Sequence, residues 1–255
     1  MRITRLYLQQ DLACDSTVTV DGQPARHIMQ VLRLRHGDRL QVFNGDGNEY
    51  AAIFSRGGRS EVMLDIQGRV DTLPESGLQI QLVQGIARND RMDLVLQKAV
   101  ELGTGRIQPL WMQRSQSHVH GERLEKRIRH WHGVIAAACE QCGRATLPEL
   151  LAPVACADWL RSDTGSGLRI MLQPDSPHVL PGLDRPEGSV TLLVGPEGGM
   201  NDDERMLATA AGFTGVRLGA RILRTETAAL AALSGIQTLW GDFSTWIAPD
   251  GQSDK

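Results

Sequence analysis

The run Gly195-Pro-Glu-Gly-Gly199 contains the residue types of a loop that a ligand can approach closely. Glycine has no Cβ to block a ligand, and Pro196 stiffens the turn. The apolar run 190–194 before it is typical of a buried strand, and Asn201 with Glu204 three residues later predicts a capped helix start. The pattern predicts a binding loop between a strand and a helix, although a tight structural turn would have the same composition.

The chemistry of this loop differs from that of the common nucleotide sites. The sequence has no G-x-x-x-x-G-K-[ST] run, which excludes a P-loop. It also has no G-x-G-x-x-G after a strand, which leaves a dinucleotide-binding Rossmann site unsupported. A carboxylate, Glu197, stands where a phosphate would otherwise bind. A ligand without phosphates is therefore favoured, and a sulfonium cofactor fits that description.

A second stretch, residues 216–228, combines apolar side chains with charged ones. We expect a strand that ends at Leu218, an irregular segment that carries Arg221 and Arg224, and a helix capped by Thr225. Such a mixed apolar and charged wall is typical of ligand pockets. A bare helix start would account for Glu226 near the positive end of the helix dipole, but it would not account for the arginines.

The four cysteines do not form a regular framework. Cys139 and Cys142 have C-x-x-C spacing, as a redox pair or half of a metal site would, but no second pair or nearby histidine pair completes a zinc set. The two thiols continue an Ala-rich helix, so neutral buried thiols are expected and no metal is implied. The N-terminus lacks an apolar signal region and no run is long enough to span a membrane, so we expect a cytoplasmic protein.

Overall charge does not indicate a nucleic-acid partner, because the formal net charge is −3. Of the 27 cationic residues 24 are arginine, which suits bidentate contacts to RNA phosphates, but codon usage in a GC-rich genome would explain the same bias. A basic cluster lies in one predicted helix beside Glu122 and Glu125, and it is either a solvated face or a phosphate-binding surface. Its members are Arg123, Lys126, Arg127 and Arg129.

The elements that position these residues follow two patterns. The first 72 residues or so show short alternating runs, polar turns and one helix, which indicate a small β-barrel. The expected strands are 3–8, 17–20, 39–43, 50–54 and 61–66, with a hairpin turn at 44–47 and a helix at 24–32.

Beyond a polar linker at 71–77, strands alternate with helices, which indicates an α/β domain with a largely parallel sheet. The expected strands are 78–86, 106–112, 168–172, 190–194 and 215–218. The expected helices are 90–102, 122–142, 202–211 and 225–240. Residues 248–255 are expected to form a flexible tail.

Together, the 195–199 run and the stretch from Leu218 to Ala228 resemble the RsmE family of 16S ribosomal RNA (uracil-N3)-methyltransferases. Further segments match this family in order, so the resemblance covers nearly the whole chain. They are His27-Ile-x-x-Val-Leu-Arg33, Gln97-Lys-Ala-Val-Glu-Leu-Gly103, Arg114-Ser115, and Ala138-Cys-Glu-Gln-Cys-Gly-Arg144 with Pro148. One local departure lies at 88–93, where the family often has Gly and Lys.

This resemblance implies a PUA-like, RNA-binding β-barrel at 1–72 and, at 73–247, a SPOUT methyltransferase domain whose chain threads a deep trefoil knot. It also implies a homodimer that holds S-adenosylmethionine in the knot and acts on 16S rRNA within the small ribosomal subunit. Carried onto this chain, the cofactor loops contain Leu172, Gln173, Pro174, Gly195, Pro196, Glu197, Gly198, Gly199, Leu218, Ile222, Leu223 and Thr225. The implied RNA-binding residues are His27, Arg33, Lys98, Arg114 and Arg144, although Lys98 and Glu101 could equally form an exposed ion pair.

The implied reaction needs a proton acceptor and an electrostatic stabiliser, because N3 of uracil is protonated at neutral pH and lies between two carbonyls. Arginine cannot act as a base, so the hypothesis gives Arg224 the stabilising role. Glu226 then orients Arg224 or accepts the proton. A structural Arg–Glu set at a dimer interface is the competing interpretation. The competing function is a non-catalytic RNA-binding or ribosome-assembly factor that has lost its cofactor.

Overall fold

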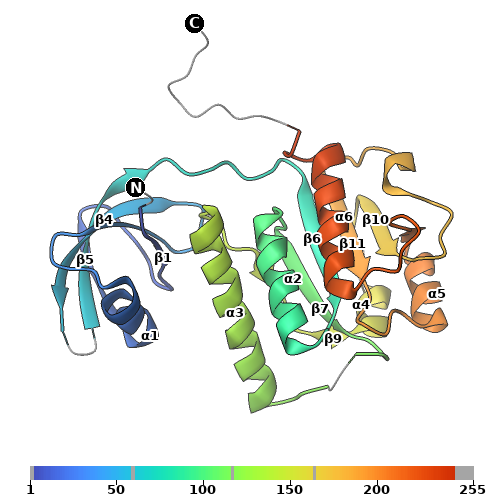
Figure 1. The fold of residues 1–255 in the computed structure, drawn as a ribbon, viewed down its shortest axis with the longest axis horizontal. Coiled ribbons are helices and arrows are strands. Elements are labelled where there is room, and N and C mark those ends of the chain that lie inside the picture. The colour runs from blue at the N-terminus through green and yellow to red at the C-terminus, as the bar shows by residue number, and fades with distance from the viewer. Residues whose placement is uncertain (1–2, 59–60, 116–117, 163–164, 245–255) are drawn as a thin grey trace, which may run out of the picture. The chain divides into compact units, whose positions relative to one another are not determined.

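The computed structural model describes residues 3–58, 61–115, 118–162 and 165–244 (Figure 1). These residues form two compact units. The first contains the chain up to Glu75 together with Ile135–Leu147, and the second contains Ser76–Val134 together with the chain from Pro148 onward. None of the helices within these ranges is long and apolar enough to cross a lipid bilayer. The predicted tail at 248–255 lies outside the described residues.

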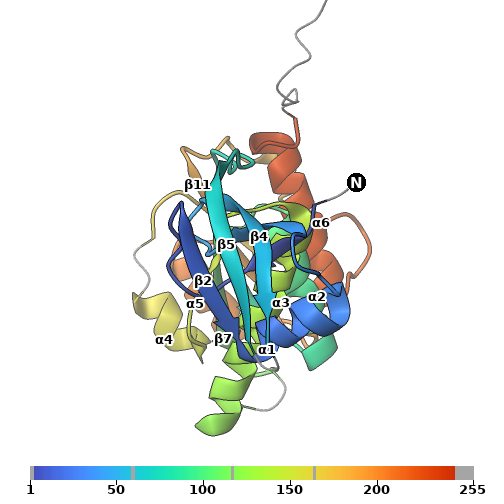
Figure 2. The same ribbon diagram turned by 90° about the vertical axis from the view of Figure 1, so that its left-hand side faces the viewer.

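The first unit is built on a five-stranded sheet, which faces the viewer in Figure 2 and has the strand order β1-β3-β4-β5-β2. β1 runs parallel to β3, and the other neighbouring pairs are antiparallel. The bounds are β1 Arg5–Tyr7, β2 Ser16–Asp21, β3 Arg39–Phe43, β4 Glu49–Gly57 and β5 Glu61–Val70. The five predicted strands are therefore confirmed, although the first is shorter than predicted.

The connection between β3 and β4 is the predicted hairpin, and its Gly45 and Gly47 have φ values of 90° and 94°, which favour glycine. The predicted helix at 24–32 is divided in two. A short helix, α1 (Gly22–Arg26), continues into a π-helix, η1 (His27–Leu32). Arg33 follows with a left-handed φ of 53° and an exposed side chain. The wide π-turn thus ends by presenting this arginine to solvent.

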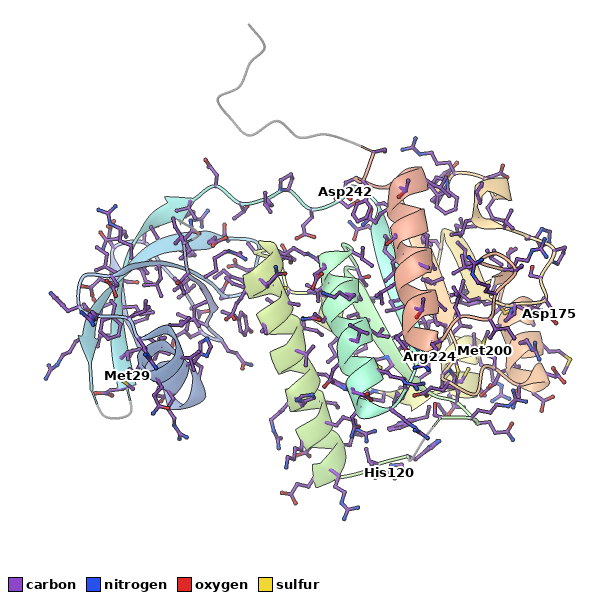
Figure 3. All side chains as sticks on the ribbon, viewed as in Figure 1. Met29, His120, Asp175, Met200, Arg224 and Asp242 are labelled. Carbon is purple, nitrogen blue, oxygen red and sulfur yellow. The ribbon has the colours of Figure 1, made fainter. Side chains whose placement is uncertain are left out.

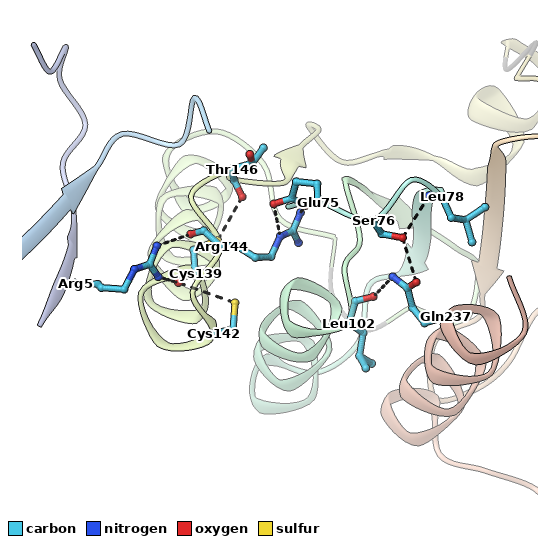
Figure 4. Close-up of polar contacts among 10 residues, drawn as sticks. All are labelled: Arg5, Glu75, Ser76, Leu78, Leu102, Cys139, Cys142, Arg144, Thr146 and Gln237. Atoms are coloured by element: carbon cyan, nitrogen blue, oxygen red, sulfur yellow. Dashed lines mark hydrogen bonds and ion pairs between the residues drawn. The ribbon is translucent and has the colours of Figure 1, made fainter. Parts of the chain in front are cut away.

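Arg5 ties residues 135–147 to the first unit (Figure 4). Its guanidinium donates to both carboxylate oxygens of Glu49, at 2.7 and 2.9 Å, and to the carbonyl oxygens of Cys139 at 2.6 Å and Arg144 at 3.1 Å. These carbonyls lie at and just beyond the C-terminal end of a long helix, where a cation interacts favourably with the helix dipole. The sequence did not predict this return of the chain, because it depends on a contact between residues 134 positions apart.

The second unit contains a sheet with the strand order β12-β10-β11-β6-β7-β8, and β9 also pairs with β7. The recorded strand pairs are all parallel, as predicted. The bounds are β6 Gln79–Gly85, β7 Arg106–Trp111, β8 Glu149–Leu150, β9 Val154–Ala155, β10 Leu168–Leu172, β11 Ser189–Val194 and β12 Thr214–Val216. The sequence did not predict β8 and β9, because a two-residue strand has no periodic pattern.

Two helices of this unit, α2 and α6, lie side by side over the sheet in Figure 1 and contact each other. Alternate strand residues, among them Val83, Leu110 and Leu193, instead form a core cluster with Trp159 of α4 and Phe213. The helix bounds are α2 Asn89–Glu101, α4 Cys156–Ser162, α5 Asp202–Ala210 and α6 Thr225–Trp240, with a 3-10 turn, η2, at Leu180–Gly182. Helix α3, Glu122–Cys142, begins in this unit and ends in the first. Helices α2, α3, α5 and α6 were predicted, whereas the short α4 was not.

The prediction that a strand runs to Leu218 is wrong, because β12 ends at Val216. Its neighbour β10 ends at Leu172, directly opposite Val216, so the sheet offers no further partner. The next amide, that of Arg217, donates instead to the carbonyl of His178 at 3.0 Å. The chain therefore leaves the sheet two residues early and enters the irregular segment 217–224. Its threading through a knot stays a prediction of the family resemblance.

The prediction that Thr225 caps the last helix is also wrong. The N-cap of α6 is Arg224, which makes no side-chain capping bond, and Thr225 is the first helical residue. The Thr225 hydroxyl donates to the carbonyl of Gly195 at 2.6 Å. A partner in a distant loop has replaced the local one that the sequence pattern suggested.

Candidate functional site

A cavity of about 310 Å³ lies at the carboxyl ends of β10, β11 and β12 in the second unit. Ligands of open parallel sheets bind at this edge. Three segments line it here: residues 172–174 at the end of β10, the 195–199 loop after β11, and the 217–224 loop after β12. The N–H of Gln173 donates to the carbonyl of Val216 at 2.9 Å, which joins the first of these segments to the third.

All twelve residues that the family resemblance assigns to the cofactor line this cavity. They are Leu172, Gln173, Pro174, Gly195, Pro196, Glu197, Gly198, Gly199, Leu218, Ile222, Leu223 and Thr225. The two stretches near 195 and 220 are therefore brought together, which is the arrangement that the sequence interpretation requires. Leucine and isoleucine side chains from two of the segments supply its apolar wall.

Gln84, at the end of β6, holds the two stretches together. Its Nε2 donates to the hydroxyl of Thr225 at 3.1 Å and lies 3.4 Å from the carbonyl oxygen of Gly195. The Thr225 hydroxyl itself donates to that carbonyl, so the three groups form one network. Gln84 is fully buried. Sequence analysis missed this residue, because glutamines stand at 79, 81 and 84 in the same strand and their type alone does not single one out.

The glycines of the 195–199 loop serve packing inside the protein more than access for a ligand. A Cβ on Gly195 would lie 3.0 Å from the backbone nitrogen of Met200 in the same loop, and one on Gly198 would lie 2.8 Å from Cβ of Arg114. Gly199 has a left-handed φ of 70°, which favours glycine. The expectation of an open backbone was therefore incomplete, because neighbouring protein atoms occupy much of the space that these glycines leave.

The predicted capping box at the start of α5 is confirmed and extends beyond the helix. Asn201 accepts from the N–H of Glu204 at 2.7 Å, and Glu204 accepts from the N–H of Asn201 at 2.9 Å. The second carboxylate oxygen of Glu204 accepts from the N–H of Gln113 at 2.8 Å. Beside it, Arg114 donates to the carbonyl of Gly198 at 2.9 Å and lines the cavity. The segment after β7 is thus fixed against the 195–199 loop.

The charged side chains that line the cavity are mostly cationic. Glu197 is the acidic residue among them, and the basic residues are Arg114, Arg205, Arg217 and Arg221. Arg205 forms an ion pair of 2.7 Å with Asp202, whereas Arg217 and Arg221 are exposed. This local excess of positive charge contrasts with the net charge of −3 of the whole chain. It suits an anionic substrate at the cavity mouth.

The two residues predicted to be catalytic lie where α6 begins. Arg224, labelled with Met200 in Figure 3, is exposed and directly follows the cavity residue Leu223. Glu226 is largely buried, and its recorded ion-pair partner is Arg91, whose Nε lies 4.0 Å from Oε1 of Glu226. Sequence analysis did not identify Arg91. A cation in the first turn of a helix is unfavourable beside the helix dipole, and that anomaly was the available signal.

The residues predicted to bind RNA are distributed over both units. His27 and Arg33 belong to the π-helix region of the first unit. Lys98 forms an ion pair of 2.7 Å with Glu101, as the alternative interpretation had it. Arg144 donates to both carboxylate oxygens of Glu75, and its side chain is 11% exposed. Arg114, in contrast, lies at the cavity.

The four cysteines are free thiols. Burial raises the pKa of Cys139 to about 12, which keeps that thiol protonated and unreactive at neutral pH. The described part of the chain contains no group of three or more His, Cys, Asp or Glu side chains placed to hold a metal ion. In the basic cluster of α3, Arg129 approaches Glu125 at 3.7 Å, and both side chains are mostly exposed.

Comparison with known proteins relates both parts of the sequence to RNA methyltransferases. A family model described as an RNA methyltransferase domain matches residues 74–237, and one described as an RNA methyltransferase PUA domain matches residues 20–67. A relative from Buchnera aphidicola, named ribosomal RNA small subunit methyltransferase E, is 30% identical over 244 residues, which cover 95% of this chain and 99% of the relative.

Two solved structures resemble the whole chain. A methyltransferase of Legionella pneumophila in complex with the cofactor SAM is 36% identical with a TM-score of 0.91, and the match covers 95% of this chain and 100% of that one. A ribosomal RNA small subunit methyltransferase E of Neisseria gonorrhoeae bound to S-adenosyl methionine is 37% identical with a TM-score of 0.87 and the same coverage. The predicted fold class is confirmed as an α/β domain with a parallel sheet preceded by a small PUA-like sheet domain, and its SPOUT-type knot stays a prediction of the family resemblance.

Proposed function

This chain belongs to the RNA methyltransferase family, and on that premise we propose that it methylates N3 of a specific uridine in 16S rRNA of the small ribosomal subunit. It is an S-adenosylmethionine-dependent rRNA methyltransferase. The choice of N3 and of a uridine is the finer part of the proposal. It accords with the resemblance of residues 195–199 and 218–228 to the uracil-N3 enzymes.

The observation that carries the proposal is the convergence of three strand-end loops on one cavity. Its volume of about 310 Å³ lies within the range of small-molecule sites. The chain offers apolar side chains and loop backbone groups there, without a phosphate-binding motif. Such a set fits S-adenosylmethionine, which has a flat adenine ring that apolar side chains can cover, polar groups that loop backbone can bind, a sulfonium and no phosphate. When bound, the cofactor supplies an electrophilic methyl group.

The chain's own residues would then prepare the nucleobase for attack. Uracil N3 must lose its proton, and the resulting anion is spread over two carbonyl oxygens. We assign stabilisation of that anion to Arg224, because a guanidinium donates several hydrogen bonds and stays charged. We assign to Glu226, in the first turn of α6, the acceptance of the N3 proton or the orientation of Arg224.

RNA capture in this proposal uses both parts of the chain. Residues 1–72 form the PUA-like RNA-binding barrel, through His27 and Arg33, and residues 73–247 form the methyltransferase domain. Arg114 and the exposed Arg217 and Arg221 lie at the cavity, where they can hold phosphates beside a uridine turned out of its stack. Lys98 and Arg144 complete the proposed RNA contacts, and each would first have to leave its carboxylate partner.

We also propose that the protein works as a homodimer in the cytoplasm, where small subunits are assembled. One feature that supports a dimer is Ile222, which is 86% exposed although it lines the cavity. A large apolar side chain that is this exposed favours an interface in which a second protein molecule packs against it. Equilibrium sedimentation of the purified protein measures this directly.

The proposed reaction is tested by mass spectrometry of 16S rRNA from a strain that lacks the gene. Loss of one 3-methyluridine, restored by the wild-type gene, is expected. A methyl group on N3 removes the hydrogen-bond donor that uracil uses in base pairing, so it stops reverse transcription at that nucleotide. A stop that occurs in wild-type RNA and not in RNA from the deletion strain is therefore an independent readout. Unchanged 3-methyluridine would refute the proposal. Methyl transfer to purified small subunits and to naked 16S rRNA then distinguishes the two substrates.

A further inference from the structure

Two carboxylates at the site come from different segments and share one guanidinium. Glu197 belongs to the 195–199 loop, Glu226 to the first turn of α6, and Arg91 to the first turn of α2. Nη1 of Arg91 lies 3.5 Å from Oε1 of Glu197, and its Nε lies 4.0 Å from Oε1 of Glu226. The three side chains are 27%, 17% and 12% exposed in the order Arg91, Glu197, Glu226, so solvent screens this cluster only partly.

In each of these two carboxylates, one oxygen has a partner in the protein and the other oxygen has none. Oε1 of Glu197 accepts from the backbone N–H of Arg88 at 2.9 Å, at the N-terminus of α2. Oε2 of Glu197 and Oε2 of Glu226, in contrast, are buried and have no hydrogen-bond partner in the described structure. A buried acceptor without a donor costs about 1–3 kcal/mol, and more when it is charged. Two such atoms, one on each carboxylate that Arg91 approaches, are acceptors for which a bound ligand can supply the donor.

The charges of the cluster lead to the same conclusion. One guanidinium faces two carboxylates, so the cluster has an excess of negative charge, whereas the charged residues that line the cavity beside Glu197 are cationic. A ligand group that donates hydrogen bonds or carries positive charge would balance it. The amino or hydroxyl donors of the cofactor and the N3–H of uracil are groups of this kind.

We propose that Arg91 is a positioning residue for methyl transfer. It holds Glu197 and Glu226 by their Oε1 atoms, so that Oε2 of Glu197 is free for a donor of the cofactor and Oε2 of Glu226 is free for the target base. This inference rests on the proposed function and adds a residue that neither the sequence motifs nor the family resemblance identified. Arg91 acts through the two glutamates and does not itself touch the reacting atoms.

The neighbouring chain explains why this position suits the role. Gln84, seven residues earlier at the end of β6, holds the Gly195 carbonyl and the Thr225 hydroxyl. Gln84 in β6 and Arg91 in the first turn of α2 therefore contact the same two parts of the chain, Gln84 through the Gly195 carbonyl and the Thr225 hydroxyl and Arg91 through the nearby carboxylates. Arginine suits this role better than lysine, because Nη1 and Nε are separate atoms of a planar fork that face different carboxylates, whereas lysine donates from a single nitrogen.

Double-mutant cycles test this proposal with the full-length protein. The variants are Arg91→Ala, Glu197→Gln, Glu226→Gln and the two pairs that combine Arg91→Ala with each glutamine. The measurements are the dissociation constant for S-adenosylmethionine by calorimetry, and kcat and KM for methylation of small subunits. Arg106→Ala serves as the control, because Arg106 forms an exposed ion pair of 2.7 Å with Glu149 in the same unit.

We expect Arg91→Ala to weaken cofactor binding about tenfold and to lower kcat about a hundredfold. The double variant Arg91→Ala/Glu197→Gln should bind the cofactor within about threefold of Glu197→Gln alone. The double variant Arg91→Ala/Glu226→Gln should likewise have a kcat within about threefold of that of Glu226→Gln alone. Losses that multiply in both pairs would overturn the proposal, because a merely structural arginine acts independently of the two carboxylates.

Arg91→Lys keeps the test decisive if the alanine variant does not fold. It should retain cofactor affinity within about threefold and lose kcat at least about tenfold, because one nitrogen replaces the two separate nitrogens that face the carboxylates. Wild-type kcat in this variant would overturn the proposal. A wild-type protein that neither binds S-adenosylmethionine nor methylates RNA would instead remove the proposed function, so the two failures are distinguishable.

Discussion

Replacing Gly85 by alanine tests whether the end of β6 sets the position of the 195–199 loop. A Cβ on Gly85 would lie 2.6 Å from Cδ and 2.7 Å from the backbone nitrogen of Pro196, and 2.8 Å from Sδ of Met112. The methionine side chain can move away, but the proline is part of the loop backbone. Ordinary carbon contacts begin near 3.4 Å, so the loop must shift by about 0.8 Å to admit the methyl group.

The size of the expected effect follows from that shift. A displacement of about 1 Å at a binding site can cost about a hundredfold in function, and an overpacked interior typically costs about 1–3 kcal/mol of stability. We expect Gly85→Ala to weaken binding of S-adenosylmethionine by about 10- to 100-fold, which is about 1.4–2.7 kcal/mol. The φ of Gly85 lies outside the left-handed region, so the expected effect is a steric clash and not backbone strain.

Isothermal titration calorimetry measures this affinity directly, and thermal unfolding shows that the variant is folded. Gly77→Ala is the matched control, because a Cβ there would have no heavy atom within 4 Å and the glycine has no positive φ. The control should bind the cofactor as the wild type does. A folded Gly85→Ala variant whose dissociation constant for S-adenosylmethionine is within twofold of the wild-type value would refute the claim that the end of β6 sets the position of the 195–199 loop.

Three further predictions concern the reaction, the first unit and the thiols. Arg224→Ala should abolish methylation while cofactor affinity stays within about tenfold, or about 1.4 kcal/mol; unchanged turnover would remove Arg224 from the mechanism. Arg5→Ala leaves the buried Glu49 carboxylate without its ion-pair partner. Denaturant titration should therefore show a loss in the free energy of unfolding on the order of 3 kcal/mol for Arg5→Ala and about 0–1 kcal/mol for Arg106→Ala, whose ion pair is exposed. Equal losses would contradict this account. Burial raises the pKa of Cys139 and Cys156 to about 12, so at pH 8 a thiol reagent should modify the exposed Cys14 rapidly and these two only after unfolding; rapid native modification of Cys139 would contradict the burial.

The parts of the fold that the sequence predicts are those whose causes are local. The hairpin at 44–47 follows from its glycines, and the start of α5 follows from Asn201 and Glu204, whose mutual bonds span three residues. Long helices and buried strands repeat their apolar residues at a fixed period, so their bounds are found within a few residues. The two-residue strands β8 and β9 contain no such repeat and were missed.

The features that could not be predicted from the sequence depend on tertiary contacts between distant parts of the chain. Thr225 has the right type and place for a helix cap, but its hydroxyl binds a carbonyl 30 positions away. Gln84 and Arg91 act on partners more than a hundred positions later in the chain, so a local pattern does not show what they contact. The motif loops could be identified from the resemblance alone, whereas the residues that hold them required the structure.

Hydrogen exchange of the wild-type protein with and without saturating S-adenosylmethionine tests the central claim most directly. If the cavity between the three loops holds the cofactor, amide exchange should slow at Gln173, across 195–200 and across 217–225, and it should change little in the five-stranded sheet of the first unit. Protection confined to other segments, or none at a concentration that saturates binding, would contradict the account.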